Sequence, residues 1–501
     1  MGKKSRFFIV AVLLLAIAAV HLMTLRPGQD WGGDFSMYMQ QARNLAEGLP
    51  YGATGYIYNP AYATIGPPTY PPVCSFFLVP AYMISGFDYE TMKLVMIGSL
   101  GVSLLFMFLV FQKELSFWPA VAIVALVGLN RCYLGDANSI GSDLPFMAIL
   151  YLSIFLILKA YETADGEPAK LGYLLPGALL IFAGYGARTV GIVLLPALCL
   201  YDILRYRRIT RALVLSVVVF GIAAVAQSKL MPSNDVSYLD QYNVGPEVFL
   251  LNALGYTKEL AAYWHNAYFK VPGAILAAII TAFAAVGFVD SLRRKIGLLE
   301  IFLVLYVIAV LMFPGYAGRR YWQPIFPLYL MYAARGLQQA WLTRHVAVRR
   351  AVFAGLLLGV MVSYAASATQ LELDIDEGVS KSESMAMFDY ITEQTNPDDV
   401  MIFIKPRVMA MLTARRTSVY HMPEKDSQLW DYFNDIDASH LVVVENDAAF
   451  DGAEDPRRVK YLREFAGRNA SRLTPVFDNA DFSIYKIDEQ ESGGEVLASG
   501  Q

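Results

Sequence analysis

Long apolar segments follow one another through most of the chain, separated by short polar or basic segments. A helix needs about 20 predominantly apolar residues to cross a bilayer, so runs near this length predict membrane-spanning helices. About eleven such runs occur, at 7–23, 91–111, 117–131, 143–160, 171–187, 188–204, 211–227, 272–290, 297–313, 321–340 and 350–367. The pattern predicts an α-helical polytopic membrane protein whose transmembrane domain occupies residues 1–367.

The first run has two interpretations. Basic residues precede the apolar segment 7–23, which suits a first membrane helix. Residues 16–18 read Ala-Ile-Ala, an A-x-A pattern of the kind at which signal peptides are cleaved. We favour the helix, because the run reaches membrane length and further spans follow it. In both cases the basic N-terminus stays in the cytoplasm and the residues after Arg26 are exported.

The apolar stretch 71–85 is short and begins with two prolines, so we predict a helix at the outer membrane surface rather than a span. Cytoplasmic loops carry an excess of Lys and Arg. With 71–85 left out of the count, the three densest basic clusters between spans lie on the side of the N-terminus. These clusters are Arg205–Arg211, Arg293–Lys295 and Arg344–Arg350. Counting 71–85 as a span would place all three outside the cell.

Two further segments are predicted to be exported. The loop 26–72 is rich in Gly, Pro and Tyr and not apolar enough to span, and long loops of this kind are often functional. Beyond residue 367 acidic residues become frequent and apolar runs shrink to strand length, which predicts a soluble α/β domain over 368–490. Its predicted strands are 400–404, 440–444 and 482–487, and its predicted helices are 382–393 and 426–435. The tail 491–501 is expected to be disordered.

The composition agrees with a membrane protein. Of the 501 residues, 56% are hydrophobic and 17% are charged, and the mean hydropathy is +0.42. Because soluble proteins carry about a quarter charged residues, this composition excludes a simple soluble enzyme and a disordered chain. A net charge of −4 gives no basic footprint for nucleic acid. Three cysteines without CxxC spacing are too few for a disulfide framework or a structural zinc site.

Ionisable side chains beside apolar segments are costly and tend to mark function. In the predicted topology they gather at the exported membrane boundary, as Asp30, Asp34, Arg43, Asp136, Asp143, Arg188, Arg319 and Arg320. Asp34 is the foremost candidate, because residues at helical spacing follow it until Gly48 ends the helix. Near a helix N-terminus the dipole stabilises a carboxylate. A helix N-cap is the alternative role of Asp34, and also of Asp143 at the start of a span.

Five segments, in this order along the chain, resemble motifs of the C-type (GT-C) membrane glycosyltransferases. They are similar in particular to the branch of protein mannosyltransferases and lipid A aminoarabinose transferases. The segments are Gly33–Gly48, Tyr70–Pro72, Ser142–Phe146, Gly186–Gly191 and Gly318–Pro327. The surface helix and the exported α/β domain also resemble that family, so the likeness covers nearly the whole chain. One departure is that relatives often carry Asp-Glu at the first motif, whereas Phe35 follows Asp34 here.

The resemblance implies transfer of a sugar from a polyprenyl-phosphate carrier to an acceptor hydroxyl on the exported face. An acceptor hydroxyl is a poor nucleophile that needs a general base, and Asp34 is the candidate. A single base with direct displacement implies inversion at the anomeric carbon. Asp143 is the second catalytic candidate, which would orient the acceptor or help to hold a metal. A divalent cation stays open, because no compact carboxylate cluster requires one, and no other cofactor is expected.

The leaving group is a phosphate, which arginine binds through bidentate hydrogen bonds. Arg188, Arg319 and Arg320 are the candidates for this contact. The alternative for Arg188 is an ion pair with Asp143 or Asp136, and the alternative for Arg319 and Arg320 is anchoring at the membrane interface.

Aromatic side chains are candidates for binding the rest of the substrate. Tyr38, Tyr70 and Tyr321 lie in the resembling segments, and Trp31 lies in the same exported loop as the first two. The alternative is the interfacial aromatic belt of membrane proteins. In the soluble domain, Arg415-Arg416 are predicted to be solvated, with a place facing the active site as the alternative.

The predicted location is the plasma (inner) membrane, with the active site and the C-terminal domain on the extracytoplasmic side. The predicted partners are a polyprenyl-phosphate-linked sugar, membrane lipids, and an acceptor lipid, glycan or protein. A transporter or flippase of a lipid-linked precursor, or an envelope assembly or sensory protein, are the rival functions. Many transporters show repeated halves with broken helices at the midplane. No internal repeat is evident in this sequence, which favours an enzyme.

Overall fold

The computed structural model describes residues 2–67, 69–164, 167–230, 245–264, 270–313, 318–339, 346–368, 378–450 and 455–488. The predicted tail 491–501 and the basic residue Arg344 lie outside the described residues. Contacts divide the chain into two compact units. The first, which we name the helical unit, combines Met1–Pro27 with Pro71–Asp374. The second, the sheet unit, combines Gly28–Tyr70 with Ile375–Gln501.

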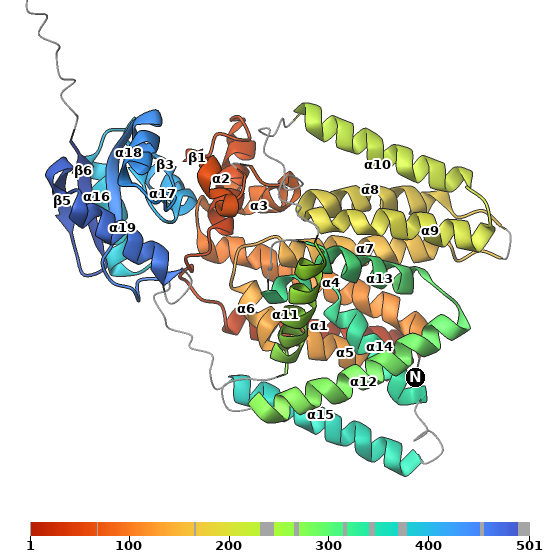
Figure 1. Ribbon diagram of the computed structural model, residues 1–501. Helices are drawn as coiled ribbons and strands as arrows, with labels where there is room; N and C mark the ends of the chain where they lie inside the picture. The colour runs from red at the N-terminus through yellow and green to blue at the C-terminus, as the bar shows by residue number, and fades with distance from the viewer. Residues whose placement is uncertain are drawn as a thin grey trace, which may run out of the picture. The chain divides into compact units, whose positions relative to one another are not determined.

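The helical unit consists of helices that lie side by side (Figure 1). They are α1 Lys3–Met23, α3 Pro72–Ser85, α4 Tyr89–Glu114, α5 Phe117–Gly128, α6 Arg131–Ala137, α7 Asp143–Ala160, α8 Leu171–Ala187, α9 Leu194–Tyr206, α10 Arg211–Leu230, α11 Pro246–Ala262, α12 Lys270–Arg294, α13 Leu298–Leu311, α14 Phe326–Gln339 and α15 Val346–Ala368. Two short 3-10 helices, η2 Thr189–Val193 and η4 Gly318–Tyr321, precede α9 and α14. Each predicted span therefore contains a helix, and the helix predicted at 71–85 is α3.

Among the described residues, six helices are long and apolar enough to cross a membrane, and α5 with α6 forms a seventh candidate that is bent by 55°. Other predicted spans are shorter apolar helices, such as α8 with 17 residues and α13 with 14. The polytopic helical class is confirmed, whereas the figure of eleven spans stays a prediction. Helix α11 was not predicted, because its segment lacks an apolar run of membrane length.

Helices α12 and α14 touch through their backbones. A Cβ atom on Gly287 would overlap the carbonyl oxygen of Tyr332, and one on Gly336 would overlap that of Phe283. Only glycine fits at either position, so the two helices approach more closely than side chains would allow. Lipid tails give helices no hydrophobic drive to associate, and close packing at small residues stabilises such contacts instead.

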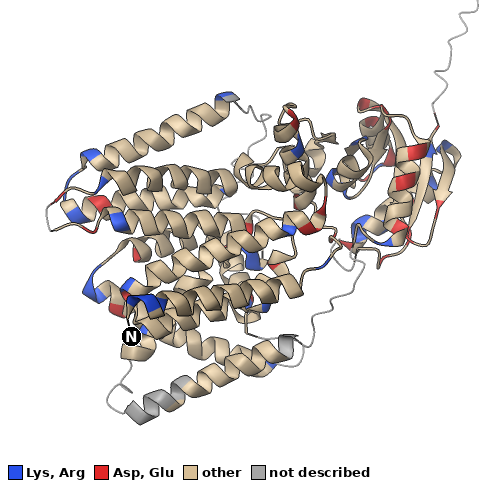
Figure 2. Cartoon of the chain, turned by 180° about the vertical axis from the view of Figure 1, so that it is seen from behind, with Lys and Arg blue, Asp and Glu red and all other residues tan. Residues whose placement is uncertain are grey.

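Charged side chains distinguish the two ends of the helical unit. Figure 2 shows a group of Lys and Arg at the helix ends where the N-terminus lies. Arg188 directly precedes the candidate span Thr189–Tyr206, and Arg205 lies at its far end. Arg188 and the basic cluster that begins at Arg205 therefore lie at opposite ends of one apolar segment.

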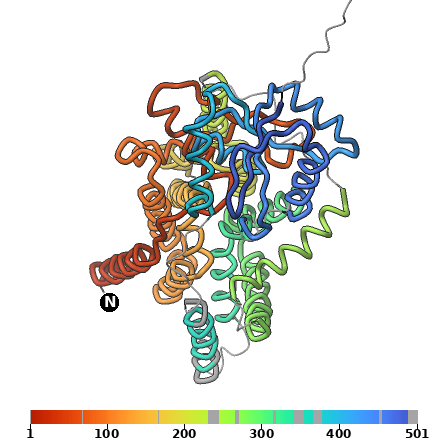
Figure 3. Tube along the Cα trace, turned by 90° about the vertical axis from the view of Figure 1, so that its left-hand side faces the viewer, coloured from red at the N-terminus to blue at the C-terminus, as the bar shows by residue number. Residues whose placement is uncertain are grey.

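The sheet unit is built on a six-stranded sheet, and its C-terminal part is the cyan-to-blue trace in Figure 3. The strand order is β1-β3-β2-β4-β6-β5; β6 pairs antiparallel with β4 and β5, and the other neighbouring strands pair parallel. The strands are β1 Tyr56–Ile57, β2 Val400–Ile402, β3 Arg416–Ser418, β4 Ala438–Val444, β5 Leu473–Asp478 and β6 Phe482–Ile487. The helices are α2 Asp34–Glu47, α16 Ser382–Gln394, α17 Pro406–Thr413, α18 Asp426–Asp435 and α19 Pro456–Arg468, with the short 3-10 helices η1 Pro60–Ile65 and η6 Ala470–Arg472.

The predicted strands of the C-terminal domain are confirmed as β2, β4 and β6, and its predicted helices as α16 and α18. The edge strand β1, however, comes from the exported loop, where Tyr56 and Ile57 pair with Thr417 and Ser418. Contacts thus group the loop Gly28–Tyr70 with the C-terminal residues, whereas the sequence predicted it as part of the transmembrane domain. A strand of two residues is too short to show the alternation that predicts strands.

Trp31 ties this loop to the core of the sheet unit. Its side chain is 1% exposed, and its ring lies 5.0–6.1 Å from the rings of Phe388, Phe403, Phe450 and Phe482. The indole Nε1 donates a hydrogen bond to the carbonyl oxygen of Ala449 at 3.1 Å. Trp31 therefore neither covers a sugar nor joins an interfacial belt, and both predicted roles are wrong.

Arg415 is buried, while Arg416 is exposed. Arg415 donates hydrogen bonds to the carbonyl oxygens of Thr392 and Thr395 at 2.9 Å and of Thr413 at 3.0 Å. These carbonyls lie in the last turns of α16 and α17, where the helix leaves them without internal partners. The prediction of two solvated arginines is wrong for Arg415, which caps both helices, and is confirmed for Arg416.

Candidate active site

Asp34 is the first residue of α2, after Gly33 at the N-cap. The helix ends at Gly48, whose φ of 70° is the left-handed conformation that glycine adopts without strain. The predicted helix and its end are thus confirmed. The N-cap position belongs to Gly33 rather than to Asp34. With 36% of its side chain exposed, the Asp34 carboxylate lies at the surface of the sheet unit, beside the positive end of the helix dipole.

One tyrosine binds this carboxylate, and a second packs against the first. The Tyr70 hydroxyl donates a hydrogen bond to Asp34 Oδ1 at 2.7 Å. The ring of Tyr38, one turn along α2, packs on the ring of Tyr70 with centroids 5.1 Å apart. Both tyrosines are buried. The first exported loop therefore brings Asp34, Tyr38 and Tyr70 into one cluster, which we name the carboxylate cluster.

A fourth member of the carboxylate cluster comes from the other end of the chain. Arg407, the second residue of α17, is buried, and its Nη1 lies 3.9 Å from Asp34 Oδ1. The same Nη1 contacts the Tyr70 hydroxyl, across 337 residues of sequence. The guanidinium also lies over the ring of Tyr56 at 5.2 Å. Burial raises the pKa of Tyr56 above its ordinary value, with the charge of Arg407 opposing the shift, so its hydroxyl stays neutral.

Sequence reasoning missed Arg407. It follows Lys405-Pro406 in a short helix that carries none of the resembling motifs. The proline at the first position of that helix was the only local signal, since proline is favoured where a helix begins. A helix start in the predicted C-terminal domain gives no indication of a contact with the first exported loop.

The other predicted site residues meet in the helical unit. Asp143 is the first residue of α7, after Ser142 at the N-cap, and its side chain is 11% exposed. Its Oδ1 forms an ion pair with Arg188 Nη1, and its Oδ2 accepts a hydrogen bond from Arg320 Nε at 2.9 Å. The predicted alternative for Arg188 is therefore realised with Asp143. Both carboxylate oxygens of Asp143 face arginine.

Arg319, the neighbour of Arg320 in η4, makes a second ion pair. Its Nη2 lies 3.2 Å from Asp136 Oδ1, in the last turn of α6. Gln323 Nε2 donates to the other oxygen of Asp136. The ring of Tyr321 lies under the guanidinium of Arg188 at 5.0 Å. We name this group, from Asp136 to Gln323, the arginine cluster.

The arginine cluster contains three guanidinium groups and two carboxylates. Arg319 and Arg320 are 33% and 40% exposed, so solvent reaches part of each side chain. A planar guanidinium presents five N–H donors in a fork that suits the geometry of a phosphate. The three arginines are therefore the residues of the helical unit that could contact an anion.

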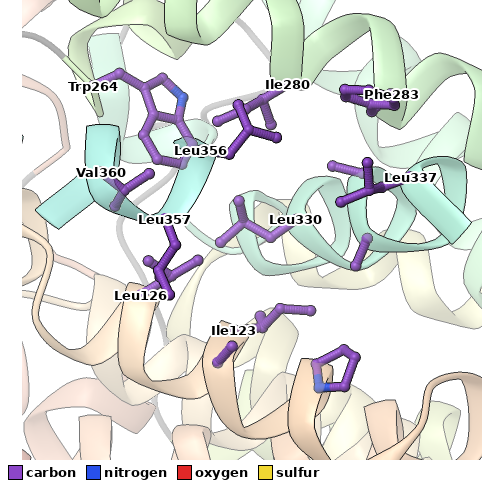
Figure 4. Close-up of a pocket in the computed structure, with 14 residues that line it drawn as sticks. Ile123, Leu126, Trp264, Ile280, Phe283, Leu330, Leu337, Leu356, Leu357 and Val360 are labelled. Atoms are coloured by element: carbon purple, nitrogen blue, oxygen red, sulfur yellow. The ribbon is translucent and has the colours of Figure 1, made fainter. Parts of the chain in front are cut away.

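An apolar cavity of about 100 Å³ lies elsewhere in the helical unit, among α5, α12, α14 and α15. Figure 4 shows the side chains that surround it, including Ile123, Phe283, Leu330 and Val360. The lining is almost wholly apolar and holds no charged side chain. Nothing in it could bind a phosphate or activate a hydroxyl, so the candidate functional residues are those of the two polar clusters, one in each unit.

Metal ligands do not gather in either cluster. In the part of the chain that the structure describes, no group of three or more His, Cys, Asp or Glu side chains could hold a metal ion. Asp136 and Asp143 are each paired with arginine, and Asp34 with Tyr70.

No family model matches this sequence. A search of curated proteins finds no match either. The comparisons that do succeed are therefore those of three-dimensional structure.

Solved membrane glycosyltransferases share the fold. ArnT from Cupriavidus metallidurans in the apo state is 14% identical with a TM-score of 0.58, and the match covers 95% of this chain and 97% of that one. The same protein bound to undecaprenyl phosphate is 12% identical with a TM-score of 0.57, over 97% and 98% of the two chains. The likeness confirms the GT-C fold that the sequence motifs implied.

Two other enzymes extend the comparison. The archaeal oligosaccharyltransferase AglB from Archaeoglobus fulgidus, solved with an inhibitory peptide and a dolichol-phosphate, is 12% identical with a TM-score of 0.55. The match covers 88% of this chain and 70% of that one. The mycobacterial arabinofuranosyltransferase AftD is 14% identical with a TM-score of 0.53, over 98% of this chain and 40% of its own. The fold of this chain is thus similar to that of an oligosaccharyltransferase and of an arabinofuranosyltransferase.

Proposed function

We propose that this protein is a glycosyltransferase that moves a sugar from a polyprenyl-phosphate donor to an acceptor hydroxyl. The observation that carries the proposal is Asp34, a part-exposed carboxylate held by Tyr70 at the start of a helix, in a chain with the GT-C fold. A carboxylate of this kind is suited to accept a proton from an approaching hydroxyl.

The reaction that suits this geometry is a single displacement. The acceptor O–H proton passes to the Asp34 carboxylate as the acceptor oxygen forms a bond with the anomeric carbon. The bond between that carbon and the phosphate oxygen breaks, and its electron pair leaves with the polyprenyl phosphate. One displacement inverts the configuration at the anomeric carbon, whereas the retaining enzymes use two.

The arginine cluster is the proposed site for the donor phosphate. Arg188, Arg319 and Arg320 converge there, and Tyr321 packs beneath Arg188. Positive charge that meets the departing phosphate favours the transition state. Asp143 contacts two of these arginines, which supports a role in holding their forks in place rather than in orienting the acceptor or a metal.

Polyprenyl carriers are the proposed donors, because ArnT and AglB were solved with undecaprenyl phosphate and dolichol-phosphate. Tyr38 and Tyr70 of the carboxylate cluster are the proposed aromatic neighbours of the sugar. A hydroxyl of a lipid, a glycan or a protein would serve equally as acceptor, since the base needs only an O–H group within reach.

We place the protein in the plasma (inner) membrane as a multi-pass protein. Basic residues gather at the end of the helical unit where the N-terminus of the chain lies, and this supports a cytoplasmic location for that end. Arg188 lies at the other end of its span, which supports a donor site on the exported side. The sheet unit is proposed to lie on that same side of the membrane.

The test is Asp34→Asn in purified protein, assayed for sugar transfer from synthetic polyprenyl-phosphate sugars to envelope acceptors. The variant keeps the shape of the side chain and removes the base, so we expect transfer to fall by about 10²–10⁴-fold. Glu47→Gln, at the exposed far end of the same helix, is the matched control and should retain activity. Retained transfer in Asp34→Asn would remove the proposed base. Lipid translocation without transfer by the native protein would instead favour the rival transporter.

A further inference from the structure

Arg407 contacts the first exported loop at several points. Its Nη2 donates to the carbonyl oxygen of Pro67 at 2.9 Å, and its Nη1 donates to the Tyr70 hydroxyl. The guanidinium lies over two aromatic rings of the same loop, Tyr70 at 4.6 Å and Tyr56 at 5.2 Å. With 4% of its side chain exposed, Arg407 is enclosed by this loop.

The contact with Arg407 determines how Tyr70 can use its own proton. The Tyr70 oxygen accepts the N–H of Arg407, and an arginine has no lone pair to accept in return. The hydroxyl proton is therefore directed to the other neighbour of that oxygen, Asp34 Oδ1 at 2.7 Å. These two hydrogen bonds run in one direction, from Arg407 through Tyr70 to Asp34.

We infer that Arg407 is a positioning residue for Asp34, which it holds through Tyr70 in the geometry needed to take the acceptor proton. This inference rests on the proposed function, in which Asp34 is the base. The permanently charged guanidinium, 3.9 Å from Asp34 Oδ1, also favours the ionised carboxylate that a base requires. The C-terminal domain thereby contributes to catalysis through one side chain that does not touch the substrate.

A purely structural arginine would look different, and the same unit contains one. Arg415 is also buried, yet its guanidinium bonds to Thr392, Thr395 and Thr413 at helix ends. Arg407 instead donates to Tyr70 and to the carbonyl oxygen of Pro67 in the exported loop. Arg415→Gln is therefore the matched control for the loss of a buried arginine.

The experiment compares Arg407→Gln, Arg407→Lys and Arg415→Gln in the full-length protein, with rates referred to the folded fraction from gel filtration. Loss of the positioning contact should lower kcat of Arg407→Gln by up to about a hundredfold, with the donor KM within about twofold. Lysine keeps the charge and a donor, so Arg407→Lys should recover part of kcat. Arg415→Gln should yield less folded protein and leave kcat of that protein unchanged. An unchanged kcat in Arg407→Gln, or an equal loss in Arg415→Gln, would overturn the inference.

A double variant separates this inference from the proposed function. If Arg407 acts through Asp34, adding Arg407→Gln to Asp34→Asn should cost no further activity, because the group that it positions is already absent. A further loss of the same factor in the double variant would overturn the inference. If Asp34→Asn alone keeps full activity, the proposed function fails first. If Arg407→Gln does not fold, Tyr70→Phe interrupts the same chain and should reproduce the loss of kcat.

Discussion

Replacing Asp143 by Asn should destabilise the helical unit and, at the same time, strengthen its response to phosphate. The substitution keeps the shape of the side chain and removes the charge that faces Arg188 and Arg320. The arginine cluster then carries one negative charge fewer. A protein with this defect should melt earlier, and an added anion should restore more of its stability than it adds to the native protein.

The magnitude follows from burial. Asp143 and Arg188 are 11% and 10% exposed, and removing one partner of such a buried pair costs about 3–5 kcal/mol. Arg320 is 40% exposed, so its ion pair contributes only about 0–1 kcal/mol. Nearly all of the loss, about 4 kcal/mol, therefore comes from Arg188. A phosphate at a hundred times its Kd would return about 2.7 kcal/mol.

The assay is thermal unfolding in detergent at low ionic strength, followed by fluorescence-detected gel filtration, with and without inorganic phosphate. Asp290→Asn is the matched control, because Asp290 also faces two arginines of the helical unit, Arg294 at 2.9 Å and Arg335 at 3.4 Å. Asp290 lies near the end of α12, outside the arginine cluster. The Asp290→Asn protein should lose some stability, and phosphate should stabilise it as much as it stabilises the native protein.

Two results would refute the reasoning on Asp143. If Asp143→Asn melts at the native temperature, its ion pair with Arg188 does not contribute to stability. If phosphate raises the melting temperature equally in the native protein, Asp143→Asn and Asp290→Asn, the arginine cluster is not an anion site. The proposed site for the donor phosphate would then be lost as well.

Other predictions address packing, donor binding and pH. Gly336→Leu would drive a side chain into the α12 backbone, so it should abolish the folded peak in gel filtration. The double variant Arg319→Gln and Arg320→Gln should raise the donor KM at least about tenfold, since each lost charge-assisted hydrogen bond is worth about 1.5–3 kcal/mol. Burial lowers the pKa of His440 below its ordinary value. The unfolded chain therefore binds the proton more readily, and the sheet unit should lose stability as the pH falls below about 6.5. His440→Gln should make this loss shallower in melting curves, and burial of His421, whose pKa is also lowered, accounts for a remaining part.

Each of these has a control and a contrary outcome. Gly98, where an added Cβ meets nothing within 4 Å, should tolerate Leu. A folded Gly336→Leu protein would contradict the backbone contact of α12 with α14. An unchanged donor KM in the arginine double variant would count against a phosphate role. A melting temperature of His440→Gln that falls with acid as steeply as that of the native protein would contradict the assignment to His440.

The predictable part of this protein is the part that local pattern encodes. A run such as 143–160 is apolar over nearly the length needed to cross a membrane, and it forms α7 with the predicted first and last residues. Asp34 at a helix start and Gly48 at its end follow from the chemistry of helix termini, which involves residues only a few positions apart. The buried strand β4 contains the apolar run 441–444, which one window of sequence reveals.

Of the candidate functional residues, the sequence predicted only those that lie in the motif segments. Asp143, Arg188 and Arg320 were expected at one boundary, but which carboxylate pairs with which arginine depends on the packing of α7, η2 and η4. Arg407 was missed because its partner Tyr70 lies 337 residues away. Short elements such as β1 and β3, with two and three residues, carry no periodic signal.

The sequence by itself determined the helical character, the acidic soluble segment, the helix that presents Asp34 and the set of arginines. Each of these depends on residues that are neighbours along the chain, where hydrophobic length and capping act directly. The tertiary structure alone decided that the loop Gly28–Tyr70 completes the C-terminal sheet and that Arg407 reaches its tyrosine. Such contacts form because buried polar groups and sheet edges must find partners anywhere in the fold, and local sequence does not encode which partner that is.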